Sequence, residues 1–272
     1  MTKIQRILVA GGDARQIYCE RHLSRRFDTG LTGFENGRME GVYDCLILPC
    51  IPIDENGSVP SETGGIPVQK LRESLAPGAL IIAGRITPEL RQYFPDNTIR
   101  DYLTREEFQL SNAVPTAEGA VETALRELPV TLSGSRVLIV GLGRIGTSLA
   151  GILKGFGADV TAAVRSAESA AKSRLLGVRP ICMEEIGGDC DVVFNTVPCT
   201  VLKTTQLEKF PRKTIFIELA SPPYGIDLEA AEKGGFRVIK ASGLPGKTAP
   251  VTAGRIIANT AEYIISEEVN YE

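Results

Sequence analysis

The chain has 272 residues, of which 43% are hydrophobic and 23% charged, so a disordered or fibrous protein is excluded and two domains of ordinary size are expected. Its 30 lysine and arginine residues against 33 aspartate and glutamate residues give a net charge of −3 without a basic run, so no nucleic-acid partner is expected. No signal-like segment opens the sequence and no apolar run is long enough to cross a bilayer, which predicts a cytoplasmic protein without a membrane partner.

The first elements alternate between strand-like and helical patterns. The runs IQRILVAGG, YDCLILP and ALIIAG are short and apolar, and each precedes an amphipathic stretch, beginning near Ala14, Val68 and Thr87. This rhythm predicts βαβ units, in which parallel strands are joined by helices.

The first strand ends in a glycine turn that leads into a helix. Asp13 suits the N-cap of this helix, where a carboxylate accepts hydrogen bonds from backbone N–H groups. Arg15 stands in the first helical turn, where the macrodipole disfavours a cation. Two interpretations of Arg15 remain open: it holds an anion over the turn, or it reaches a nearby carboxylate.

Residues 49–67 are rich in proline and glycine, which predicts a long irregular loop rather than a regular element. A loop of this length is either a functional lid or binding loop, or a mobile surface segment.

A long helix is predicted over residues 111–128, with Pro115 near its start, where helices tolerate proline. The apolar residues at helical spacing form one face. They are Val114, Ala117, Val121, Ala124, Leu125 and Leu128.

The strand–helix rhythm then restarts, with five strand candidates at RVLIVGLGRIG, GADVTAAVRS, DVVFNTVP, TIFIELAS and FRVIKAS. The predicted fold class is α/β, with two Rossmann-like doubly wound parallel-sheet domains joined by the long helix. We expect a substrate domain over residues 1–125 and a dinucleotide domain over residues 130–254. A last helix, within residues 250–272, is expected to dock on the first domain through Ile256, Ile257, Thr260 and Ile264.

A G-x-G-x-x-G hexapeptide lies between a strand and a helix in the second half. In this context the first glycine makes a tight turn, the second lets a pyrophosphate approach the backbone, and the third lets helix and strand pack closely. The pyrophosphate then sits on the helix N-terminus. The predicted binding residues are Gly141, Leu142, Gly143, Arg144, Ile145 and Gly146.

The next strand indicates which dinucleotide is bound. An NAD site usually ends this strand with a carboxylate that accepts from the ribose hydroxyls. Here Arg165 and Ser166 take that place, and both can hydrogen-bond a 2′-phosphate. The sequence therefore favours NADP.

The loops after the later strands are expected to surround the nicotinamide, because strand C-termini line the ligand crevice of an open α/β sheet. The residues expected there are Thr196, Val197, Pro198, Ala220, Ser221 and Gly243.

Two rare residue types limit the chemistry. His22 is the one histidine and lies in a polar-faced helical segment, which argues against a histidine triad, a zinc site or a histidine base. The six cysteines contain no C-x-x-C pair and are expected to be reduced packing residues. No metal is expected.

Six segments, GGDARQ, N-x-VPTAEGA, VLIVGLGRIG, NTVP, ELASPP and GLPGKTAPVTAG, occur in this order over nearly the whole chain. With them the sequence resembles the A-subunit of dipicolinate synthase from spore-forming bacteria. The resemblance implies an enzyme of sporulation that oxidises dihydrodipicolinate to dipicolinate with NADP, together with a flavoprotein-like B-subunit. One departure is ELASPPYG, where family members more often have DLAS and a Pro-Gly-Gly-type turn, so the conformation of this loop stays open.

This implied reaction fits a chain with one histidine, because aromatisation drives the loss of one hydride and one ring proton. A dianionic substrate needs cationic and hydroxyl donors. The candidates to bind it, some of them across an interdomain cleft, are Asp13, Arg15, Arg85, Asn112, Thr116, Lys247 and Thr248. The proton acceptor is expected to be a carboxylate such as Glu118, or water.

Two other classes of function remain open from the residues alone. One is another two-domain NADP-dependent dehydrogenase of a small carboxylate, similar to shikimate or alanine dehydrogenase. The other is a non-catalytic nucleotide sensor, although the chain has no basic DNA-binding segment. The sequence also leaves open whether the protein forms a homo-oligomer.

Overall fold

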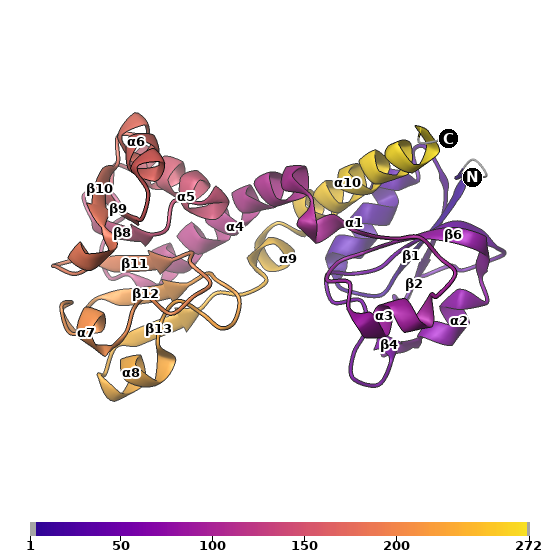
Figure 1. The fold of residues 1–272 in the computed structure, drawn as a ribbon, viewed down its shortest axis with the longest axis horizontal. Coiled ribbons are helices and arrows are strands. Elements are labelled where there is room, and N and C mark those ends of the chain that lie inside the picture. Colours follow the sequence, from indigo (N-terminus) through magenta and orange to yellow (C-terminus); the bar gives the residue numbers. More distant parts are fainter. Residues whose placement is uncertain (1–3, 271–272) are drawn as a thin grey trace. The chain divides into compact units, whose positions relative to one another are not determined.

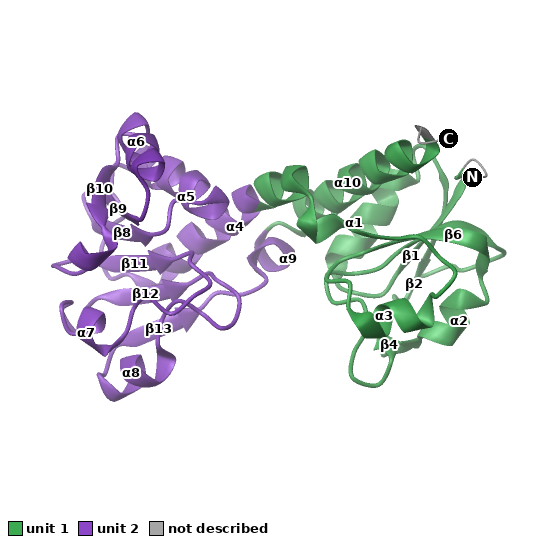
Figure 2. Ribbon diagram, viewed as in Figure 1, with its two compact units in different colours: residues 1–112, 249–272 green, residues 113–248 purple. Residues whose placement is uncertain are grey.

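A computed structural model describes residues 4–270, and the chain divides into two compact units (Figures 1 and 2). Unit 1 combines residues 1–112 with residues 249–272, and unit 2 comprises residues 113–248. The ends of the expected first domain and last helix, residues 1–3 and 271–272, lie outside the described residues. Within residues 4–270, no helix has both the length and the apolar character needed to span a membrane.

Unit 1 contains a five-stranded sheet, and every neighbouring pair of its strands is parallel. The strand order is β2-β1-β3-β6-β7, so the winding direction reverses between β1 and β3. The strands are β1 (Arg6–Ala10), β2 (Asp28–Thr32), β3 (Tyr43–Ile47), β6 (Leu75–Ala83) and β7 (Ile99–Asp101). The sequence patterns missed β2 and β7, because DTGLT and IRD carry few apolar residues.

Two hydrophobic layers cover the faces of this sheet, as the two-residue period of the strands requires. Ile7 and Val9 face a layer that includes α1 (Ala14–Leu23) and α10 (Pro250–Asn270). Leu8 faces the opposite layer, under the shorter helices. The remaining elements of this unit are α2 (Val68–Arg72), α3 (Pro88–Tyr93), the 3-10 turn η1 (Tyr102–Thr104), and the first part of α4 (Glu106–Glu127).

The segment over residues 49–67 is not wholly irregular, which corrects the loop prediction. It contains β4 (Ser58–Val59) and β5 (Ile66–Pro67), which pair as a short antiparallel ladder. The Pro60 carbonyl also accepts a hydrogen bond of 2.5 Å from the Gly12 amide. The segment is therefore folded against the first glycine turn.

Helix α10 packs against α1 within unit 1, although the two are far apart in sequence (Figure 1). The expected face residues Ile256, Ile257, Thr260 and Ile264 are all buried. At Gly254 the two backbones come so close that a Cβ would lie 2.9 Å from the Cys19 amide nitrogen.

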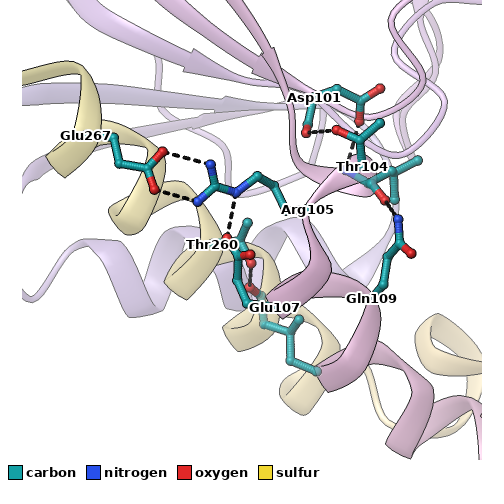
Figure 3. A network of polar contacts seen from close by, with 9 residues as sticks. Asp101, Thr104, Arg105, Glu107, Gln109, Thr260 and Glu267 are labelled. Carbon is teal, nitrogen blue, oxygen red and sulfur yellow. Dashed lines mark hydrogen bonds and ion pairs between the residues drawn. The ribbon is translucent and has the colours of Figure 1, made fainter. Parts of the chain in front are cut away.

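Ion pairs add to the contact between α10 and the rest of unit 1. Figure 3 shows Arg105 donating to both oxygens of Glu267, at 2.7 and 2.6 Å, while its Nε donates to Glu107 at 2.6 Å. Arg100 makes a similar two-bond pair with Glu268. These pairs fix the last turns of α10 at the edge of the sheet.

Unit 2 has a six-stranded parallel sheet of order β10-β9-β8-β11-β12-β13, which confirms the doubly wound Rossmann-like fold. The strands are β8 (Arg136–Val140), β9 (Asp159–Val164), β10 (Arg179–Cys182), β11 (Val192–Asn195), β12 (Ile215–Glu218) and β13 (Arg237–Lys240). Strand β10, which reads RPIC, had no strand-like pattern and was not predicted. The helical elements are α5 (Arg144–Gly155), α6 (Ala167–Leu175), the 3-10 turn η2 (Met183–Glu185), α7 (Thr204–Leu207), α8 (Leu228–Lys233) and α9 (Leu244–Thr248).

Helix α4 differs from its prediction in three ways. It begins at Glu106, so Pro115 lies inside the helix rather than near its start. Val114 and Leu125 are 46% and 50% exposed, so the buried face is narrower than expected. The helix also changes unit after residue 112 (Figure 2), because its buried alanines join the core of unit 2. The expected boundaries at residues 125 and 254 therefore shift to 112 and 248.

Candidate functional site

The glycine hexapeptide of unit 2 connects β8 to α5 at the carboxyl edge of the sheet. Strand β8 has β9 on one side and β11 on the other, so the turn lies at the point where the strand order reverses. In open α/β sheets this point is where the crevice for a ligand forms. The N-terminal N–H groups of α5 provide an anion-binding end there.

Each glycine of the turn has a separate structural reason. Gly141 has a φ of 89°, and a Cβ there would lie 2.6 Å from Val197 Cγ2. A Cβ at Gly146 would collide with the Gly141 carbonyl oxygen, so this glycine lets α5 pack against the turn. A Cβ at Gly143 would meet no atom within 4 Å. Gly143 therefore leaves room for a ligand at the backbone.

A cavity of about 440 Å³ lies beside this turn in unit 2. The sequence-predicted residues that line it are Gly141, Leu142, Gly143, Arg165, Ser166, Thr196, Val197 and Pro198. Its other lining residues, which the sequence patterns did not identify, are Ala163, Val164, Ser169 and Met183. The register of β9 against β8 could have indicated Ala163, which pairs with Val140. Val164 pairs with the unpredicted strand β10, and Met183 follows that strand.

Arg165 and Ser166 lie at the end of β9. These are the two residues that the sequence predicts to discriminate between NADP and NAD. The exposed Arg165 has no hydrogen bond or ion pair within the described residues. The Ser166 hydroxyl accepts from the Ser169 amide at 3.1 Å and so caps α6. A second cavity, of about 240 Å³, borders the same two residues and also contacts Arg174, a cation that no motif had indicated.

The two loops that follow β11 and β12 are held together by one buried carboxylate. Glu218 is 1% exposed, and its Oε1 accepts from Asn195 Nδ2 at 2.6 Å and from the Ala220 amide at 2.9 Å. Its Oε2 accepts from the amides of Gly225 and Ile226 at 3.0 and 2.9 Å. Glu218 begins the ELASPPYG segment, where family members more often have the shorter aspartate. Its carboxylate therefore has a full set of donors, and the loop folds back onto it.

This arrangement also supports one wall of the large cavity. The Asn195 side-chain amide donates to the Val197 carbonyl at 3.0 Å, and the Thr196 hydroxyl bonds the Val140 carbonyl at 3.0 Å. Two residues predicted to surround the nicotinamide, Ala220 and Ser221, do not line the cavity. The Ala220 amide instead donates a hydrogen bond to Glu218. Arg144, Ile145, Gly146 and Gly243 do not line the cavity either.

In unit 1, Asp13 and Arg15 lie together at the start of α1. Asp13 caps the helix, and its carboxylate accepts from Arg15 Nε and Nη2, both at 2.8 Å. Burial is the largest single influence and opposes the charge on both groups, but the hydrogen bonds and the Coulombic attraction together outweigh it, lowering the pKa of Asp13 and raising the pKa of Arg15. Of the two interpretations of Arg15, the structure shows the contact with a nearby carboxylate.

Cys50 completes this cluster from the segment after β3. Its Sγ accepts from Arg15 Nη1 at 3.4 Å and from the Tyr102 hydroxyl at 3.3 Å. Burial raises the pKa of Tyr102 well above its usual value. The sequence patterns gave no signal for Cys50 or Tyr102, because their positions depend on contacts between separate loops.

The other candidates for substrate binding are distributed over both units. Arg85, in unit 1, is exposed and has a φ of 44°. Asn112 ends the unit 1 part of α4, while Thr116 and the exposed Glu118 lie on its unit 2 part. In unit 2, α9 carries the last two, Lys247 and Thr248. A Cβ at Gly119 would lie 3.0 Å from the Thr248 hydroxyl, so α4 and α9 are in close contact.

Comparisons with known proteins place this geometry in a family. Residues 103–222 match the model of the D-isomer specific 2-hydroxyacid dehydrogenase NAD-binding domain. The dipicolinate synthase A-subunit of Bacillus subtilis (strain 168) is 30% identical over 285 aligned residues, covering 96% of this chain and 96% of that protein. The chain belongs to the dipicolinate synthase A-subunit family.

Solved structures of this family agree with the assignment. The A-subunit structure from Bacillus halodurans has a TM-score of 0.87 at 30% identity, over 96% of this chain and 97% of that one. The corresponding dipicolinate synthase structure from Bacillus subtilis has a TM-score of 0.88 at 30% identity, over 100% and 99%. Unit 2 is thus a nicotinamide dinucleotide-binding domain in a protein of the dehydrogenase class.

Proposed function

We propose that this chain is the NADP-binding subunit of a dipicolinate synthase, oxidising dihydrodipicolinate to pyridine-2,6-dicarboxylate during sporulation. Membership of the family supports the reaction. As the family name indicates a partner, we propose that a flavoprotein-like B-subunit completes the enzyme. The cytoplasm is the proposed location.

The observation that carries the choice of cofactor is the unpartnered Arg165 at the end of β9. It borders both cavities of the dinucleotide site, and no acidic side chain lines the larger one. A guanidinium in this place can pair with a 2′-phosphate, whereas a carboxylate would repel it. NADP, when bound, supplies a nicotinamide ring that accepts a hydride.

The residues of this chain that would hold NADP fit that role. Gly143 leaves space for the pyrophosphate beside the N-terminus of α5. Thr196 and Val197 form a wall that Asn195 and Glu218 keep in place. Arg165 contributes the positive charge at the ribose end.

For the substrate we propose the cluster at the start of α1 in unit 1. An arginine has five N–H donors, and the hydrogen bonds to Asp13 and Cys50 use three of those of Arg15. The two remaining donors can bind a carboxylate of a dianion. The other proposed substrate contacts are Arg85, Asn112, Thr116, Lys247 and Thr248, with Glu118 or water as the proton acceptor.

A paired experiment separates the two binding roles. Arg165→Asp should weaken NADP binding about 30-fold or more in a calorimetric titration and should leave NAD binding within a factor of a few. Arg15→Ala should lower kcat/KM for the dihydropyridine substrate about 30-fold or more, assayed by NADPH formation with the B-subunit present, while NADP affinity stays unchanged.

Arg91→Asp is the matched control, because Arg91 is an exposed arginine of α3 whose side chain has no partner among the described residues. It changes the net charge by the same amount as Arg165→Asp and by more than Arg15→Ala, and it should alter neither NADP affinity nor kcat/KM. A wild-type protein that prefers NAD would overturn the cofactor assignment, and unchanged kinetics of Arg15→Ala would remove Arg15 from the substrate site.

A further inference from the structure

The smaller cavity of unit 2, of about 240 Å³, lies between helix α6 and the edge strand β10. It shares Val164, Arg165 and Ser166 with the larger cavity, so the two cavities meet at the end of β9. No glycine of the hexapeptide lines it. The smaller cavity therefore adjoins the dinucleotide site at the residues that follow β9, rather than at the turn that suits the pyrophosphate.

One face of α6 forms a wall of this cavity. Ala167, Ala170 and Arg174 all line it, and their spacing of three and four residues places them on the same side of the helix. The two alanines leave space beside the first turns of α6. Helical side chains lean toward the N-terminus of their helix, so the long side chain of Arg174 faces the space that the alanines leave.

The lining of the smaller cavity has an excess of positive charge. The guanidinium groups of Arg165 and Arg174 have no hydrogen bond or ion pair within residues 4–270. Glu185 is the one acidic residue among the described residues that line the cavity, and its Oε2 accepts from the Cys182 amide at 2.7 Å. Two like charges beside one small cavity repel each other, and a bound dianion would offset that repulsion.

The start of α6 adds neutral donors to the same cavity. Ser166 caps this helix and Ala167 is its first residue, and both line the cavity. The first N–H groups of a helix have no partner within it and favour an anion. The cavity thus combines two guanidinium groups with a helix N-terminus, which is a set of donors suited to a phosphate.

We infer that the smaller cavity is the subsite for the 2′-phosphate of NADP, and that Arg174 is a second specificity-determining residue beside Arg165. The inference rests on the proposed function and extends it. Arg165 borders both cavities, so a dinucleotide in the larger cavity would place this phosphate between the two guanidinium groups. NAD has a hydroxyl in place of the phosphate and would gain nothing from Arg174.

Calorimetric titration of the full-length protein tests the role of Arg174. Arg174→Gln should weaken NADP binding about tenfold or more, because a charge-assisted contact with the phosphate is lost, and should leave NAD binding within about twofold. Lys172→Gln is the matched control, since Lys172 is an exposed cation of the same helix that does not line the cavity. It removes the same charge and should leave both affinities near those of the wild type.

Cys182 gives a second readout in the wild-type protein, because it is exposed and lines the smaller cavity. Saturating NADP should slow alkylation of Cys182 by iodoacetamide about threefold or more relative to saturating NAD, since access governs the reaction of a thiol. Mass spectrometry of the Cys182 peptide measures the rate. Cys199, exposed and next to Pro198 of the larger cavity, is the internal control, and the two dinucleotides should change its rate equally.

The outcomes separate the inference from the proposed function. A loss of NADP affinity in Arg174→Gln but not in Lys172→Gln, with Cys182 protected more by NADP than by NAD, supports the inference. Equal NADP affinities of the two variants, or equal protection of Cys182 by the two dinucleotides, would overturn it even if the wild type prefers NADP. A wild-type protein that prefers NAD would refute the proposed cofactor, and the inference would fail with it.

Discussion

Glu218 illustrates how one buried residue can support the wall of a cavity without lining it. Its carboxylate is buried, no cation contacts it in the described part of the chain, and four neutral N–H donors satisfy it. Because one donor is the last residue of β11 and the other three lie in the loop after β12, the carboxylate ties that loop to the end of β11. The cavity wall at Thr196 and Val197 depends on that connection.

Replacing this carboxylate by an amide should therefore loosen the cavity wall. In Glu218→Gln one acceptor oxygen becomes an NH2 group that faces N–H donors, so we expect a loss of about 1–3 kcal/mol in the free energy of unfolding. Dinucleotide affinity should fall with it. Urea unfolding and calorimetry check both effects, with Glu229→Gln, at an exposed residue of α8, as the control. Wild-type stability in Glu218→Gln would contradict this role.

Two buried thiols in the core of unit 1 should make stability depend on alkaline pH. Cys19 and Cys45 are 0% exposed, and burial raises the pKa of each. Above about pH 8.5 the unfolded chain loses these protons while the folded protein keeps them. Stability therefore falls as the pH rises, by up to about 1.4 kcal/mol per pH unit for each thiol.

The slope of unfolding free energy between pH 7.5 and pH 9.5 is the measurement. It should become shallower in a variant with both Cys19→Ala and Cys45→Ala, whatever that variant's baseline stability. The exposed Cys182 supplies the control substitution, Cys182→Ala. Equal slopes in the wild type and the double variant would show that these thiols do not titrate as expected.

Among the elements, helices α1 and α10 depend on one small residue for their contact. Gly254 lies in the interior of α10, where alanine would have the higher helix propensity. A Cβ there would lie 2.7 Å from Tyr18 Cβ and 2.9 Å from the Cys19 amide nitrogen, so the clash outweighs that gain.

Gly254→Ala should thus destabilise the protein by about 1–3 kcal/mol in urea unfolding. Gly151→Ala in α5 is the matched comparison, since a Cβ at this exposed helical position meets no atom within 4 Å. That variant should gain about 0.5–1 kcal/mol. If both variants shifted stability in the same direction, the close approach of the two helices would not be the controlling factor.

The accuracy of prediction from the sequence also varied by element. The turn at Gly141 and the cavity residues Thr196 and Val197 were predictable, because they depend on a local strand–turn–helix pattern. Strands β2, β7 and β10 were missed, because tertiary pairing rather than apolar content makes them strands. The contacts of Cys50 with Arg15 and Tyr102 could not be predicted, since they depend on how segments far apart in sequence meet.

At the scale of the whole molecule, unit 2 is continuous in sequence and unit 1 is not. A fragment of residues 113–248 contains all six strands of its sheet and the buried face of α4. We expect this fragment to unfold cooperatively and to bind the dinucleotide with an affinity within about threefold of that of the full chain. Circular dichroism during urea unfolding and calorimetry test this, and a non-cooperative transition would contradict it.

The discontinuity of unit 1 also has a consequence for biosynthesis. The first 112 residues leave the ribosome long before α10, whose Ile256, Ile257 and Ile264 complete the apolar layer over their sheet. At usual translation rates unit 1 must wait on the order of ten seconds for this helix. During that interval α1 packs on this sheet face without α10, and the part that α10 will cover is open to water and to other nascent chains. The half-covered N-terminal sheet is therefore the surface through which the unfinished protein would aggregate or bind a chaperone.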